Sequence, residues 1–104
     1  MKKIIDGKRY DTERAEEIVH WSNGCSRSDF GYVEESLYRT KSGNYFVAGC
    51  GGSLSNYASP CGTGGYSGGS DIQPLSKDAA RVWLEDRGLT KTLEEFFAED
   101  ITDA

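Results

Sequence analysis

The chain has 104 residues, of which 37% are hydrophobic and 12% aromatic, and its formal net charge is −5. A chain of this length builds one hydrophobic core, so we expect a single domain over residues 1–104. The apolar content excludes a disordered chain, and no apolar run is long enough for a signal peptide or a membrane span. We therefore expect a cytoplasmic protein with no membrane partner.

The negative charge gathers at the C-terminus. Residues 94–104 contain five acidic residues and no basic one, whereas residues 1–41 carry eight of each sign. An acidic end argues against direct binding of nucleic acid through its phosphates and favours contact with a basic protein surface. The alternative is a solvated helix end that keeps the chain soluble.

The N-terminal half predicts a hairpin, a helix and a second hairpin. Asp6-Gly7 lies between two short runs and is typical of a tight type I′ turn. Asp11-Thr12 then offers helix N-cap chemistry before Ala15, Ile18 and Val19, and Asn23-Gly24 offers a stop, which predicts an amphipathic helix between them. The runs 32–40 and 45–48, joined through 41–44, predict the second hairpin.

The C-terminal half predicts a long loop, an edge strand and two more helices. Residues 49–70 hold eight glycines and predict a glycine-rich loop that is functional, clipped in place or mobile. Pro74 limits the strand 71–75 to a sheet edge. A helix from Ser76 to Arg87 and an acidic helix and tail over 90–104 follow. We expect an α+β fold: a small, mostly antiparallel sheet of two hairpins and an edge strand, packed with about three helices.

One histidine and three cysteines make the sharpest candidate site. The four side chains, His20, Cys25, Cys50 and Cys61, match the nitrogen and sulfur donors of tetrahedral Zn²⁺. A structural zinc would clip the glycine-rich loop between a helix end and a strand end. The spacings contain no close Cys-x2-Cys pair, so three unconnected, partly buried thiols and a structural histidine remain an alternative, and a Cys50–Cys61 redox pair is another.

Catalytic patterns are weaker. Cys25 and His20 could form a thiol nucleophile and its base, but no nucleophile turn or oxyanion-hole motif accompanies them. The run Cys61-Gly62-Thr63-Gly64-Gly65 lacks the following Lys-Ser/Thr and helix start of a phosphate-binding loop. We therefore expect a protein that is not an enzyme, with a small thiol-dependent enzyme as the less favoured alternative.

Three stretches together resemble a known group of proteins. They are residues 3–12, residues 35–46, and the late segments Ser67-Gly68-Gly69, Ile72-Gln73-Pro74-Leu75 and Ala80 to Trp83. They are similar to small accessory proteins carried by phages and mobile elements of Gram-positive bacteria. The resemblance implies an anti-CRISPR protein that binds a type II effector nuclease (Cas9) and blocks DNA loading or cleavage. The resemblance also implies a location in the cytoplasm of a bacterial host cell. It implies a glycine-rich turn after the second hairpin that does not require cysteine, so Cys50 and Cys61 would be features of this chain.

The expected function is therefore stoichiometric inhibition by protein binding. Acidic side chains would face a basic groove of the nuclease, and loop aromatics would anchor the contact. The candidate contacts are Tyr57, Tyr66, Glu94, Glu95, Glu99 and Asp100. A general interaction or regulatory module of a mobile element is the alternative.

Overall fold

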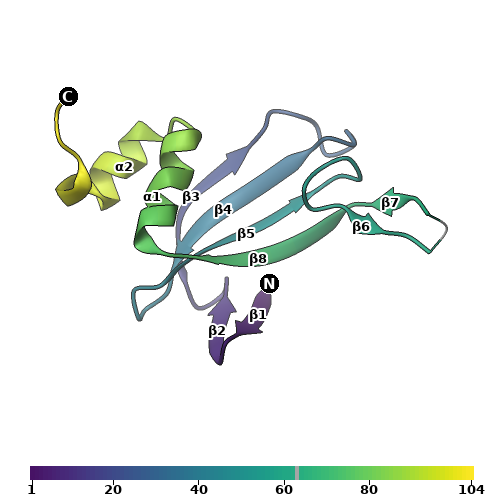
Figure 1. Cartoon of the computed structure of the whole chain (residues 1–104), viewed down its shortest axis with the longest axis horizontal. Coiled ribbons are helices and arrows are strands. Elements are labelled where there is room, and N and C mark those ends of the chain that lie inside the picture. Colours follow the sequence, from purple (N-terminus) through teal and green to yellow (C-terminus); the bar gives the residue numbers. More distant parts are fainter. Residues whose placement is uncertain (63) are drawn as a thin grey trace.

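The computed structural model describes residues 1–62 and 64–104, with principal extents of 50 × 34 × 20 Å. A four-stranded antiparallel sheet in the order β3-β4-β5-β8 is its centre, formed by Glu16–Ser22, Val33–Arg39, Tyr45–Gly51 and Gly69–Leu75. Helices lie against one face near one end, a separate hairpin lies against the other face, and a second small hairpin projects from the far end (Figure 1). The fold is α+β with antiparallel sheets, as the sequence predicts.

The N-terminal hairpin forms as predicted but stays outside the main sheet. Strands β1 (Lys2–Ile5) and β2 (Lys8–Asp11) pair with each other only. Asp6 and Gly7 have φ values of 50° and 76°, which a tight turn of this kind requires. The hairpin contributes Tyr10, which packs with Phe46, Ala48 and Ile72 on one face of the sheet.

The helix predicted after Thr12 is wrong, because Glu16–Ser22 is strand β3. Its register against β4 shifts between Glu17 and Val19, so Ile18 is an extra residue that breaks the alternation of a regular strand. Ile18, Val19 and Trp21 all pack against the helix-side core. Ile18 and Val19 mimic part of a helical stripe, although their β-branched side chains favour a strand. The chain thus has two α-helices and one 3₁₀ turn among its described residues.

The two C-terminal helices form where the sequence predicts them. Ser76 Oγ accepts a hydrogen bond from the Ala79 amide at 3.0 Å, which caps α1 (Lys77–Asp86), and Gly88 ends it with a φ of 66°. Helix α2 (Thr90–Phe96) and the 3₁₀ turn η1 (Ala98–Asp100) follow. Together they cover the sheet face opposite the N-terminal hairpin. The buried residues of this larger core are Leu37, Tyr45, Val47, Ala80, Trp83, Leu84, Leu93 and Phe97.

Strand β8 completes the main sheet, whereas the glycine-rich segment before it forms a small hairpin of its own. Strand β8 is an edge strand, as Pro74 requires, and pairs with β5 along its length. The segment predicted as one loop contains the short strands β6 (Ser59–Pro60) and β7 (Tyr66–Ser67), which pair with each other. Much of the segment is therefore ordered against neighbouring backbone.

Candidate functional site

Glycines let the glycine-rich segment lie close to the sheet. A Cβ atom added to Gly49 would overlap the Tyr57 hydroxyl, and one added to Gly52 would overlap the carbonyl oxygen of Phe30. Gly68 lies in the same way against the carbonyl oxygen of Gly51. Glycine is required at Gly52 and Gly68 because a side chain there would overlap neighbouring backbone, and at Gly49 because a side chain would displace the Tyr57 ring.

A hydrogen-bonded network of Tyr57, Glu35 and Arg87, which we call the tyrosine clip, holds this segment in place. The Tyr57 hydroxyl donates to Glu35 Oε2 at 2.5 Å, and Arg87 Nη2 donates to Glu35 Oε1 at 2.5 Å. Burial, followed by the hydrogen bond to the Glu35 carboxylate, raises the pKa of the Tyr57 phenol well above its ordinary value. The buried Glu35 carboxylate therefore ties the glycine-rich segment to the end of α1.

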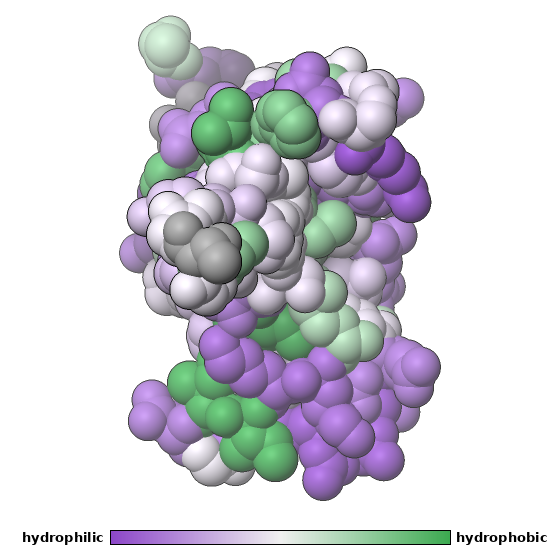
Figure 2. Space-filling model, turned by 90° about the vertical axis from the view of Figure 1, so that its right-hand side faces the viewer, coloured by the Kyte–Doolittle hydropathy of each residue, from purple (hydrophilic) through white to green (hydrophobic). Residues whose placement is uncertain are grey.

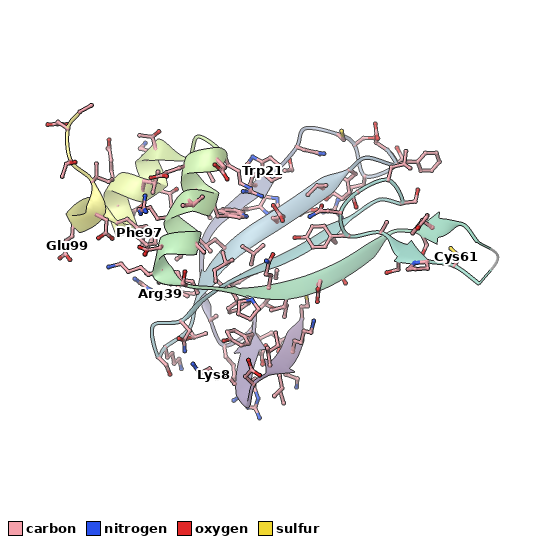
Figure 3. The ribbon with its side chains drawn as sticks, in the orientation of Figure 1. Lys8, Trp21, Arg39, Cys61, Phe97 and Glu99 are labelled. Atoms are coloured by element: carbon pink, nitrogen blue, oxygen red, sulfur yellow. The ribbon has the colours of Figure 1, made fainter. Side chains whose placement is uncertain are left out.

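The guanidinium of the same arginine lies over two indole rings. Its guanidinium carbon lies 4.8 Å from the Trp21 ring centre and 4.2 Å from that of Trp83. Trp21 comes from β3 and Trp83 from α1, and Figure 3 shows Trp21 next to that helix. A guanidinium placed over aromatic rings in this way is favoured in its charged form. Arg87 thus joins an edge strand, a helix and, through Glu35, the glycine-rich segment.

Two neighbouring loops present large apolar side chains beside this clip. Phe30, between β3 and β4, is 67% exposed, and Leu54, after β5, is 77% exposed. The Leu54 amide donates to the Phe30 carbonyl at 2.8 Å, so the two loops are in contact. Tyr66, on the projecting hairpin, is 64% exposed. We call the surface around Phe30, Leu54 and Tyr66 the loop end.

The loop end is built on ordered backbone. Asn23 Nδ2 donates to the Gly31 carbonyl at 2.8 Å, and Asn23 Oδ1 accepts from the amides of Cys25 and Val33, each at 3.2 Å. Asp29 Oδ1 accepts from the Gly31 amide at 2.7 Å. Figure 2 views this end of the molecule and shows hydrophobic side chains at the surface above the projecting hairpin.

The four predicted zinc ligands lie on separate elements. His20 is on β3 and not at a helix end, Cys50 is on β5, Cys25 is in the β3–β4 loop, and Cys61 is exposed next to β6. Within residues 1–62 and 64–104, no three His, Cys, Asp or Glu side chains are grouped so that they could hold a metal ion. Among these residues the structure therefore does not bring the four predicted ligands together as one group, and a structural zinc stays a prediction.

The predicted partner contacts do not form one surface. Tyr57 is held by Glu35, whereas Tyr66 is exposed at the loop end. Figure 3 places Glu99 and Cys61 at opposite ends of the molecule. The acidic contacts are exposed on α2 and η1, and they are Glu94, Glu95, Glu99 and Asp100. A single partner that contacts both the acidic residues and Tyr66 would therefore have to extend from one end of this protein to the other.

A polar hollow on the hairpin side of the sheet was missed by the sequence reasoning. It has a volume of about 310 Å³ and is lined in part by His20, Glu34, Ser36 and Cys50. His20 Nδ1 lies 2.9 Å from Ser36 Oγ, and His20 Nε2 lies 3.3 Å from Glu34 Oε1. His20 thus meets Ser36 and Glu34, not Cys25. The spacing along the chain carries no sign of this cluster, because strand register alone sets His20 opposite Ser36 and Glu34 opposite Cys50.

Comparisons with known proteins show no relative. No family model matches the chain, and neither a curated protein nor a solved structure matches it. Among the described residues, neither α-helix has the length and apolar content needed to cross a bilayer.

Proposed function

We propose that this protein is a non-enzymatic binding protein. It inhibits a partner protein because its loop end binds to the partner and blocks the partner's function. The observation that carries the proposal is the contact between two ordered loops that expose Phe30 and Leu54. Large apolar side chains on a surface lose water favourably when a partner covers them. A few well-packed anchor residues near the centre of an interface usually supply most of its binding energy.

The composition of the loop end supports the same function. Residues 22–32 and 50–70 are rich in Ser, Gly, Asn and Tyr. Antibody binding loops have this composition, because aromatic anchors give contact area at low entropic cost while small polar residues adapt their hydrogen bonds. The tyrosine clip at Glu35 holds the second of these segments before a partner arrives, so less ordering is needed on binding.

The partner to test first is a type II CRISPR effector nuclease, Cas9. This choice follows from the resemblance to accessory proteins of phages and mobile elements. Inhibition would act by blocking DNA loading or cleavage, with one inhibitor bound per nuclease. The acidic side chains of α2 and η1 face a different direction, so in this proposal they steer the approach to a basic partner and the loop end makes the contact.

The test compares two pairs of exposed apolar residues. The variant Phe30→Ala with Leu54→Ala changes the loop end, and Val82→Ala with Ile101→Ala changes apolar residues that are exposed on the helical side. Pull-down on Cas9 and a cleavage assay at matched stoichiometry are run with each. We expect the wild type and the Val82/Ile101 variant to bind and inhibit, and the Phe30/Leu54 variant to lose at least about tenfold in affinity.

Absence of binding and of inhibition by the wild type would overturn the Cas9 assignment. The broader function as an interaction module of a mobile element is then tested by affinity capture from bacterial lysate with the same two variants. A partner retained equally by both variants would overturn the loop end as the binding surface.

A further inference from the structure

The hollow on the hairpin side contains a carboxylate whose hydrogen-bonding capacity is only partly used. The Glu34 side chain is 24% exposed, and its closest cationic or potentially cationic neighbours are His20 Nε2 at 3.3 Å and Arg27 Nη2 at 3.4 Å. A close charge-assisted hydrogen bond has a length of about 2.7–2.9 Å. Both oxygens of Glu34 can therefore accept a shorter and stronger bond than they have here.

The arginine that reaches this carboxylate is weakly held. The Arg27 side chain is 83% exposed, and within residues 1–62 and 64–104 it forms an ion pair with Glu34 alone. An ion pair with so exposed a partner contributes little, because water and salt screen the charges. Arg27 can therefore give way to a guanidinium group that enters the hollow from outside.

The walls of the hollow suit an arginine side chain. Ala48 and Cys50 supply apolar surface against which the methylene groups of an arginine side chain can pack. The Ser36 hydroxyl, beside His20, offers a further polar contact. The other cation on the wall, the Met1 ammonium, donates to Thr12 Oγ1 at 3.0 Å. The neighbouring carboxylate of Glu35 is occupied by Arg87. Glu34 is thus the acceptor that remains for an incoming cation.

We infer that this hollow is a binding site for an arginine side chain of a partner protein, with the Glu34 carboxylate as its acceptor and Arg27 as the group displaced. The planar guanidinium presents parallel N–H donors that match the two carboxylate oxygens, which a lysine ammonium does not. The inference rests on the proposed function for its partner and deepens it, since Arg27 and Phe30 lie on the same loop between β3 and β4. The site itself does not depend on the apolar anchors.

A small probe tests the site without any partner protein. N-acetyl-arginine amide is titrated into the protein while the ring signals of His20, the single histidine, are followed by NMR. N-acetyl-citrulline amide, which has nearly the same shape but no charge, is the control. We expect a saturable shift with the arginine probe and none with the citrulline probe.

Two substitutions change the affinity in opposite directions. Glu34→Gln removes the charge of the acceptor, so we expect the arginine probe to bind about tenfold more weakly. Arg27→Ala removes the competing guanidinium, so we expect binding about threefold tighter. Circular dichroism checks that both variants keep the fold.

Three results would overturn the inference: equal shifts with the two probes, unchanged affinity in Glu34→Gln, or weaker binding in Arg27→Ala. The Phe30→Ala/Leu54→Ala variant separates this site from the proposed function. It should bind the arginine probe as the wild type does, even if no protein partner is found.

Discussion

The helical side and the loop end of this protein are held by different interactions. On the helical side, Leu37, Leu84 and Phe97 are almost completely buried, and apolar contact between α1, α2 and the sheet stabilises the fold. At the loop end, the glycine-rich segment is held by the Tyr57–Glu35–Arg87 network and by close backbone contact, while Phe30 and Leu54 face outward. One region buries its large apolar residues in the core, and the other leaves Phe30 and Leu54 exposed to solvent.

The largest expected effect lies on the helical side. Leu84→Ala leaves a cavity in the centre of the core and should lower the free energy of unfolding by about 2–5 kcal/mol. Val82→Ala on the same helix changes an exposed position and should alter it by no more than about 0.5 kcal/mol. Urea denaturation measures both. Equal effects of the two substitutions would contradict the assignment of the core to this face.

A smaller loss of stability is expected when the close contact between Gly49 and the Tyr57 ring is disturbed. The new methyl group in Gly49→Ala pushes Tyr57 away from Glu35, which should cost about 1–3 kcal/mol. Gly62→Ala is the matched control, because a Cβ atom there meets no other atom within 4 Å. Hydrogen exchange of residues 52–58 should accelerate in the Gly49 variant alone. Unchanged exchange would show that the segment does not depend on this close approach.

Removing one hydroxyl tests the clip directly. Tyr57→Phe leaves the buried Glu35 with one donor fewer and should lower the free energy of unfolding by about 1–2 kcal/mol at neutral pH. Tyr66→Phe, at an exposed position, should have no measurable effect.

The stabilisation that Tyr57 provides should also depend on pH in the alkaline range. Burial and Glu35 raise the pKa of Tyr57 in the folded state above its ordinary value of 10.0. The unfolded chain loses this proton first, so the stabilisation from Tyr57 is fully present below pH 10.0 and is lost as the pH rises through the folded-state pKa. The stability difference between wild type and Tyr57→Phe should therefore narrow in strong alkali. A constant difference would contradict the raised pKa of Tyr57 in the folded state.

The smallest effect is expected where the N-terminal hairpin meets the sheet edge. Lys3 Nζ lies 2.7 Å from Asp71 Oδ1, and this contact, followed by the Ile72 amide, lowers the pKa of the Asp71 carboxyl. Because both side chains are about half exposed, Lys3→Met should cost less than about 1 kcal/mol. The loss should disappear at high salt and as the pH falls through the folded-state pKa of Asp71, below its ordinary 3.8. A loss that persists in acid would point to lost packing instead.

Local signals explain which elements were predictable. The Asp6-Gly7 turn, the Ser76 cap and the Gly88 stop each satisfy a backbone requirement within a few residues, so they predict their elements without tertiary information. Strand β3 was misread because its bulge at Ile18 sets neighbouring apolar residues against the same core. That arrangement depends on the partner strand β4, which no local pattern reports.

The candidate site shows the same limit. Cys25, Cys50 and Cys61 stand out by residue type, yet the fold leaves them on separate elements. The clip joins Glu35, Tyr57 and Arg87 across 22 and 52 residues of sequence, and the hollow joins His20 and Ser36 across 16. Carboxylates, tyrosines and arginines are common surface residues, so only their spatial meeting distinguishes these few.

The sequence by itself determined an α+β class, the first hairpin, the strands β4, β5 and β8, and the two C-terminal helices, because turn, cap and periodicity signals act over a few residues. Tertiary structure alone decided that residues 16–22 form an edge strand, that the glycine-rich segment is held by a buried carboxylate, and that Glu34 lies beside His20. Strand register and the burial of a charge depend on the whole fold, since each requires partners from distant parts of the chain.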